Sequence, residues 1–244
     1  MVIESERAVA CRGVHKSYGQ GDTRVAALRG IDLEVRSGEL LMLVGPSGCG
    51  KTTLISVIAG ILDHDEGTCI VFGEDLKRMT RAEKTAFRGR NIGFVFQTYQ
   101  LLPALSAAEN VAVPLFIHGV PRRSALERAA TLLERMGMAE KRNALPAQLS
   151  SGQQQRVAIA RSLVHEPRLI VCDEPTSALD RQTGERVMEL LRAVAVAPGR
   201  SLVVVTHDVR IFHLADRIAA MDDGRIQEVS EAPERSPHPT SGVP

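Results

Sequence analysis

The sequence predicts an α/β fold with a mostly parallel core sheet, an antiparallel β region and a helical subdomain. Short apolar runs at 40–44, 169–172 and 202–205 are separated by segments of helical periodicity. That alternation is typical of buried parallel strands joined by crossover helices. The first run ends in glycines and precedes an apolar stripe at helical spacing. Strand, tight loop and helix is the order that a phosphate-binding loop requires.

The composition suits one large domain and argues against a nucleic-acid partner and against a membrane-spanning helix. The 244 residues are 44% hydrophobic, with 30 basic and 29 acidic residues, so a substantial core is expected and a nucleic-acid partner is not. The longest apolar runs are far shorter than the ~20 residues of a membrane-spanning helix. If the protein works at a membrane, another chain crosses it.

The cysteines and the N-terminus favour a cytosolic protein. None of the four cysteines has the CxxC spacing of a metal site, and reduced thiols are expected. Residues 1–6 lack the basic stretch and apolar core of a secretion signal.

The first part of the chain is expected to form the antiparallel β region. Apolar residues alternate within 9–14 and 26–35, and a glycine-rich turn signal lies between them. The stretch 76–149 is expected to be mainly helical, because an apolar stripe with charged residues opposite runs through 125–136.

Domain boundaries follow from these segments and from the C-terminal composition. We expect one domain over 1–230, with the helical subdomain at about 98–165. Prolines and serines in 231–244 predict a disordered tail.

Residues 45–52 read Gly-Pro-Ser-Gly-Cys-Gly-Lys-Thr and match the phosphate-loop pattern. Glycines let successive backbone N–H groups point at phosphate oxygens, Lys51 reaches the β- and γ-phosphates, and the Thr52 hydroxyl ligates Mg²⁺. The loop indicates a nucleoside triphosphate but not the reaction, because kinases, GTPases and motors share it. The predicted nucleotide-binding residues here are Gly45, Ser47, Gly48, Cys49, Gly50, Lys51, Thr52 and Thr53.

A second motif lies at 149–156, which reads Leu-Ser-Ser-Gly-Gln-Gln-Gln-Arg and continues as Val-Ala-Ile-Ala-Arg. It resembles the signature of the ABC ATPase family. A hydroxyl and a glycine at a helix start form an anion site. The resemblance implies that Ser150, Gly152 and Gln153 contact ATP held by a second copy, with Ser150 and Ser151 at the dimer interface. Ser151 replaces a family glycine, so we expect a tuned contact rather than an abolished one.

The run 169–172 leads directly into two carboxylates at a strand tip, where open α/β sheets bind ligands. This segment resembles the family's Walker B strand. The resemblance implies that Asp173 holds Mg²⁺ through water and that Glu174 orients and polarises the attacking water. Residues 175–180 match the family's D-loop, which would place Asp180 at the dimer interface.

Three further positions match family motifs. His207 corresponds to the switch histidine that contacts the γ-phosphate. Gln97 corresponds to the Q-loop glutamine, which would sense Mg²⁺ and the attacking water. Tyr18 corresponds to an aromatic platform that stacks on adenine, and base stacking of this kind is worth ~1–3 kcal/mol.

The resemblance spans residues 8–228 and implies a P-loop NTPase of the ABC ATPase type. Softer matches at 14–18, 90–97, 101–103, 109–111 and 113–115 look like the branch of lipoprotein-releasing and macrolide-exporting ATPases. This implies an ATPase with ATP and Mg²⁺ as cofactors, working as a homodimer on the cytoplasmic face of the inner (plasma) membrane. Its partner would be an integral membrane permease on another chain, docked near 97–105, for export or extraction of a hydrophobic or lipid-linked cargo.

Two other functions stay open from the sequence. A regulatory ABC ATPase could drive an extracytoplasmic hydrolase with the same motifs. A soluble ABC ATPase could act on DNA or ribosomes, although such proteins usually carry a coiled coil, a zinc hook or a second ATPase domain. Cys49 is either a reactive thiolate beside Lys51 or an incidental small residue.

Overall fold

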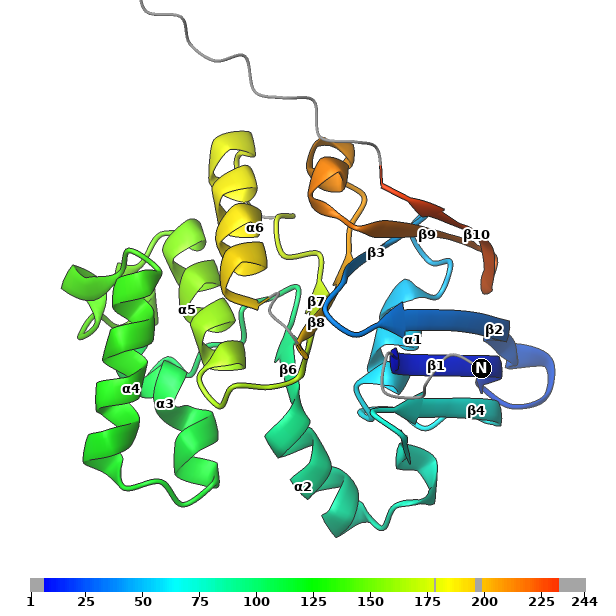
Figure 1. The fold of residues 1–244 in the computed structure, drawn as a ribbon, viewed down its shortest axis with the longest axis horizontal. Helices are drawn as coiled ribbons and strands as arrows, with labels where there is room; N and C mark the ends of the chain where they lie inside the picture. The colour runs from blue at the N-terminus through cyan, green and yellow to red at the C-terminus, as the bar shows by residue number, and fades with distance from the viewer. Residues whose placement is uncertain (1–6, 178, 196–198, 233–244) are drawn as a thin grey trace, which may run out of the picture.

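A computed structural model describes residues 7–177, 179–195 and 199–232. Two β-sheets and a group of helices form its layers (Figure 1). The strands are β1 (Arg7–Tyr18), β2 (Val25–Arg36), β3 (Leu40–Val44), β4 (Glu66–Val71), β5 (Glu74–Asp75), β6 (Ile92–Val95), β7 (Leu169–Asp173), β8 (Ser201–Val205), β9 (Arg217–Asp222) and β10 (Arg225–Glu231). The helices are α1 (Lys51–Ile58), α2 (Arg81–Asn91), α3 (Ala107–Ile117), α4 (Arg122–Arg135), α5 (Ser151–Leu163) and α6 (Arg181–Ala195).

The central sheet has the strand order β10-β9-β3-β8-β7-β6. All its neighbouring strands are parallel except β9 and β10, which pair antiparallel. Alternate residues of β3, β7 and β8 enter two apolar clusters, one on each face of the sheet. Burial on both faces explains why these strands read as continuous apolar runs. The predicted mostly parallel α/β fold is therefore confirmed.

The antiparallel region is the four-stranded sheet β2-β1-β4-β5. It packs with α1 in one apolar cluster, while α3, α4 and α5 belong to the other cluster. Figure 1 shows this sheet and the α3–α5 group on opposite sides of the central sheet. The central sheet therefore lies between a second β-sheet on one side and a group of helices on the other.

Two sequence predictions need correction. The stretch 76–149 is mainly helical but includes the strand β6, which pairs in parallel with β7 at the sheet edge, and this non-local pairing fixes it as a strand. Two residues of the predicted tail belong to the sheet instead, since Glu231 pairs with Arg217 and the Ala232 N–H donates to the Asp216 carbonyl. Residues 233–244 of the predicted tail, and the N-terminal residues 1–6, lie outside the described residues.

The described cysteines are all buried free thiols. None of the helices in the described ranges has both the length and the apolarity needed to span a membrane.

Candidate nucleotide site

The phosphate loop joins β3 to α1 at the carboxyl end of the central sheet. Gly45 and Gly50 have φ values of 149° and 102°, which only glycine adopts readily. A Cβ at Gly45 would overlap the Met221 carbonyl, and one at Gly50 would overlap the Ala27 carbonyl. These glycines let the loop pass closely between its neighbours and curl toward α1.

Lys51 lies inside the curve of this loop. Its side chain is 7% exposed, and its Nζ donates to the carbonyl oxygens of Gly45 and Pro46 at 2.8 and 2.7 Å. The Cys49 thiol is also buried, 3.6 Å from the Lys51 ammonium. The ammonium is thus held where the glycine-rich backbone turns around it.

Thr52 meets the tip of β7, two strands away from β3 in the sheet. Its hydroxyl donates to Asp173 Oδ2 at 3.0 Å. Burial raises the pKa of Asp173, and the Thr52 hydrogen bond and Lys51 oppose that rise. A hydroxyl and a carboxylate side by side are oxygen ligands suited to Mg²⁺.

These two residues fit Mg²⁺ as it is bound in phosphate sites. No group of three His, Cys, Asp or Glu side chains within the described ranges could hold a metal alone. Magnesium usually takes one or two protein oxygens and completes its shell with water and substrate phosphates. The Thr52 and Asp173 pair therefore matches a shared site rather than a protein-only cage.

Glu174 and His207 come from the tips of the neighbouring strands β7 and β8. Glu174 has a φ of 47°, and its N–H donates to the Val205 carbonyl at 2.9 Å. His207 Nδ1 lies 3.1 Å from Glu174 Oε1. Both residues line a cavity of about 260 Å³ that also includes Thr206. Non-glycine residues whose backbone is held in the left-handed conformation cluster at active sites, and Glu174 is such a residue.

Gln97 and Tyr18 flank this region. Gln97 is exposed two residues after β6, whose carboxyl end lies beside that of β7. Tyr18 ends β1, and its hydroxyl lies 3.5 Å from Thr53 Oγ1 on α1. Tyr18 remains 46% exposed, so its ring is available beside the start of α1.

The 149–156 motif forms the start of α5. The Ser150 hydroxyl accepts from the Gln153 N–H at 3.3 Å, and Gln153 Oε1 accepts from the Ser150 N–H at 3.0 Å. This capping box fixes the exposed N-terminal end of the helix. Ser151 is helical and does not have a positive φ, so the serine that replaces the family glycine is not in a strained backbone conformation.

Gly152 and the start of α6 are in close contact. A Cβ at Gly152 would lie 2.8 Å from Thr183 Cγ2, and the Thr183 N–H donates to Asp180 Oδ1 at 3.1 Å. The Thr183 hydroxyl, followed by its N–H, lowers the pKa of the exposed Asp180. The structure therefore brings 150–153 next to Asp180. Within the described part of the chain, no hydrogen bond joins 150–153 to the phosphate loop.

Sequence reasoning assigned no role to Arg161, which anchors the segment after Gln97. Its guanidinium donates to the carbonyls of Tyr99 and Gln100 at 2.8 and 2.6 Å. Burial lowers the pKa of Arg161. The position of Arg161 at the end of the signature run was the sequence signal that could have singled it out. Its partners could not be found from the sequence, because they lie about 60 residues away in the chain.

Tyr99 is a second residue that the sequence did not single out. Its hydroxyl is buried with no hydrogen-bond partner in the described ranges. Burial raises the pKa of Tyr99, and the neighbouring Ser151 hydroxyl opposes this rise without forming a well-directed bond. The replaced signature position thus faces the segment that follows Gln97.

Comparisons with known proteins agree with this geometry. The family described as "ABC transporter" matches residues 28–177. The lipoprotein-releasing system ATP-binding protein LolD of Shewanella sp. (strain MR-4) is 43% identical over 220 residues, covering 90% of this chain and 95% of LolD. An uncharacterized ABC transporter ATP-binding protein of Thermotoga maritima is 45% identical, with 88% and 92% covered.

A solved structure shares the fold. The dimeric post-hydrolysis structure of the ATP-binding cassette MJ0796 bound to ADP and Pi has a TM-score of 0.85 and 36% identity, and the match covers 93% of this chain and all of that chain. A strand–loop–helix phosphate site, paired acids at the tip of β7 and these relatives lead to one conclusion. The chain belongs to the ABC transporter family and is an ATP-binding, ATP-hydrolysing subunit.

Proposed function

We propose that two copies of this chain bind two ATP molecules head to tail and drive a separate membrane permease. The observation that carries this proposal is the exposed, capped start of α5, which has no hydrogen bond to the phosphate loop among the described residues of its own chain. A helix N-terminus with a hydroxyl and close backbone approach suits a γ-phosphate. Ser150, Gly152 and Gln153 would complete the site of the second copy, with Ser151 and Asp180 at the interface. The similar cassette MJ0796 is dimeric with ADP and Pi bound, which supports a dimer of this chain.

The chemistry of hydrolysis then follows from the two strand tips. Lys51 and the loop N–H groups bind the β- and γ-phosphates, and Tyr18 stacks on adenine. Thr52 and Asp173 would hold Mg²⁺, with Gln97 beside them, and the ion neutralises phosphate charge when bound.

Glu174 accepts a proton from the attacking water and orients it toward the γ-phosphorus. His207, 3.1 Å from Glu174, holds that carboxylate in place and contacts the γ-phosphate. Loss of the bridging γ-phosphate then reopens the dimer, and the helical subdomain at about 98–165 moves with it.

The permease would dock in a groove next to the Gln97–Leu105 segment. The groove has a volume of about 350 Å³ between α1, α2, β6, α3 and α5. Its apolar lining includes Ile61, Phe94, Phe96, Pro114 and Ile117. The lining also has four basic side chains and no acidic one, and the basic side chains are Arg88, Arg161, His118 and His165. Ile117 is 77% exposed. An apolar permease segment with an acidic residue fits this surface.

The named relative suggests the cargo. LolD is by name the ATP-binding protein of a lipoprotein-releasing system, so we infer export or extraction of a hydrophobic or lipid-linked cargo. The chain would sit on the cytoplasmic face of the inner membrane, held there by its permease.

Copurification from detergent-solubilised membranes tests this function. The tagged chain is expected to retain a membrane protein, and Ile117→Asp to lose it. Val229→Asp is the matched control, because Val229 is exposed on β10 outside the groove. Recovery of DNA or ribosomes in place of a membrane chain would contradict the proposal.

A further inference from the structure

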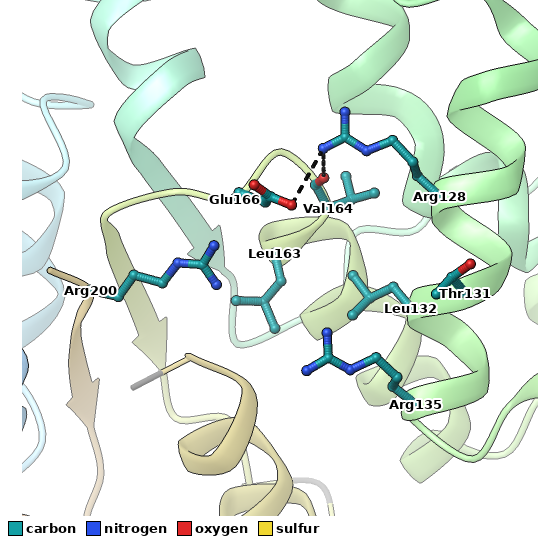
Figure 2. A pocket seen from close by; sticks show the side chains of 8 residues that line it. All are labelled: Arg128, Thr131, Leu132, Arg135, Leu163, Val164, Glu166 and Arg200. Carbon is teal, nitrogen blue, oxygen red and sulfur yellow. Dashed lines mark hydrogen bonds and ion pairs between the residues drawn. The ribbon is translucent and has the colours of Figure 1, made fainter. Parts of the chain in front are cut away.

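A further concave site lies at the amino ends of the central strands, opposite the carboxyl ends that carry the nucleotide residues. It has a volume of about 290 Å³ between α4, the end of α5 and the residue before β8. Figure 2 shows its lining: Arg128, Thr131, Leu132, Arg135, Leu163, Val164, Glu166 and Arg200. Glu166 precedes β7 and Arg200 precedes β8, so this cavity faces the amino ends of strands whose carboxyl ends hold the ATP residues.

Three guanidinium groups from two separate parts of the fold meet at this cavity. Figure 2 shows the side chains of Arg135 and Arg200 pointing into the same space from opposite walls. Arg128 instead donates to the Val164 carbonyl at 3.0 Å and lies 3.9 Å from Glu166. Neither Arg135 nor Arg200 has a hydrogen bond or an ion pair to another described side chain. The cavity therefore presents two positive groups without a counter-charge.

The single carboxylate in the lining is held by the turn that ends α5. Glu166 has a φ of 57°, and its N–H donates to the Leu163 carbonyl at 2.9 Å. This turn places the Glu166 carboxylate near Arg128 (Figure 2). One acid against three arginines leaves an excess of two positive charges in the lining.

The floor of the cavity is apolar. Leu132, Leu163 and Val164 are 9%, 5% and 4% exposed. A low-dielectric floor strengthens the attraction between guanidinium groups and an anion above it. Planar guanidinium groups bind phosphate oxygens in a bidentate fashion.

We propose that this cavity binds a small phosphate-bearing anion through Arg135 and Arg200. The volume lies at the low end for small-molecule sites, which favours a compact phosphate or diphosphate group over a large ligand. Such an anion would bridge α4 of the helical group to the start of β8 in the central sheet. The phosphate could belong to a soluble compound or to a phospholipid headgroup.

Titration calorimetry with inorganic pyrophosphate tests the site. The protein is saturated with ADP so that the phosphate loop is filled. We expect saturable binding that weakens about tenfold in Arg135→Ala and in Arg200→Ala, because each loses a charge-assisted hydrogen bond. Glu166→Gln should bind more tightly, since it removes the only repelling charge. Arg123→Ala is the control on the same helix, because Arg123 pairs with Glu127 and does not line the cavity.

A second measurement separates the two sources of phosphate. The protein is sedimented with phosphatidylcholine vesicles, with and without phosphatidic acid. Arginine-dependent binding to the phosphatidic acid vesicles would assign the site to a headgroup, and binding of pyrophosphate alone would assign it to a soluble compound. The proposal is overturned if neither probe binds, or if Arg200→Ala binds as tightly as Arg123→Ala.

Discussion

His207 Nδ1 lies 3.1 Å from Glu174 Oε1, although the two residues are 33 positions apart in the chain. The contact exists because β7 and β8 are adjacent and in register, with Asp173 opposite Val205. Each side chain extends from the first turn beyond its strand. The contact between His207 and Glu174 therefore depends on the pairing of β7 with β8, because the two side chains could not hold each other in this position without it.

Removing the imidazole should slow hydrolysis more than it weakens ATP binding. His207→Ala leaves Glu174 without its positioning partner, so we expect kcat to fall about 10–100-fold with a small change in KM. Steady-state phosphate release measures both constants. His213→Ala is the control, since His213 is exposed on the 3₁₀ helix Val209–Leu214. Equal rates for the two variants would exclude a role for the His207 contact.

The ionised Asp173 side chain should lower the free energy of unfolding of the protein without nucleotide. Its folded-state pKa is raised from an ordinary value of 3.8 by burial, so the folded protein holds this proton more tightly than the unfolded chain does. The contribution of this group to the free energy of unfolding therefore falls as pH rises from 3.8 through the folded pKa, and its cost is fully present above that folded pKa.

Asp173→Asn should consequently raise the free energy of unfolding at pH 7, with no gain at low pH. The same variant should lose stabilisation by ATP and Mg²⁺. Urea unfolding at several pH values measures the effect, with the exposed Asp222→Asn as control. A variant less stable than the natural protein at pH 7 would show that the carboxylate stabilises this fold.

Local motifs were predictable because each is contained in a few consecutive residues. The phosphate loop needs only a strand, closely spaced glycines and a helix, and the strand tip at Asp173 and Glu174 follows a continuous apolar run. Both were placed correctly from the sequence. The roles of their side chains stay predictions until variants are measured.

Features that depend on distant pairing were not predictable in this way. β6 is a strand because β7 lies beside it, and its four residues alone do not separate strand from helix. The Arg161 bonds to Tyr99 and Gln100 and the cavity at Arg200 also join segments far apart in sequence. No local pattern reports such contacts.

Neighbouring positions of the signature should respond very differently to substitution. Gly152→Ala places a Cβ 2.8 Å from Thr183 Cγ2, so overpacking should cost about 1–3 kcal/mol of stability and weaken ATP-dependent dimerisation. Ser151→Gly should leave ATPase activity within about tenfold, because Ser151 is exposed at an unstrained helical position. Thermal unfolding and phosphate release measure the two effects. A larger loss of stability for Ser151→Gly than for Gly152→Ala would contradict this account of the motif.

Arg161 should act as an anchor for the segment after Gln97. Arg161→Ala removes two charge-assisted hydrogen bonds to backbone carbonyls, and we expect a loss of about 2 kcal/mol. Arg161→Lys should recover part of this loss, since one ammonium cannot reproduce the guanidinium fork. Chemical denaturation compares both with Arg123→Ala. Hydrogen exchange of the amides at 98–101 should rise only in the Arg161 variants.

We propose that ATP joins two copies of the chain and that Glu174 acts only in hydrolysis. Glu174→Gln keeps the shape of the side chain but removes its basicity, so kcat should fall about 100-fold or more while ATP still binds. Full activity in this variant would contradict the assignment of Glu174 as the base.

The most direct measurement is the mass of Glu174→Gln by light scattering, with and without saturating ATP and Mg²⁺. We predict the 26.5 kDa monomer without nucleotide and twice that mass with ATP. Ser150→Ala combined with Gly152→Asp in the same background should prevent the dimer. A Glu174→Gln protein that stays monomeric at saturating ATP would contradict the shared-site account.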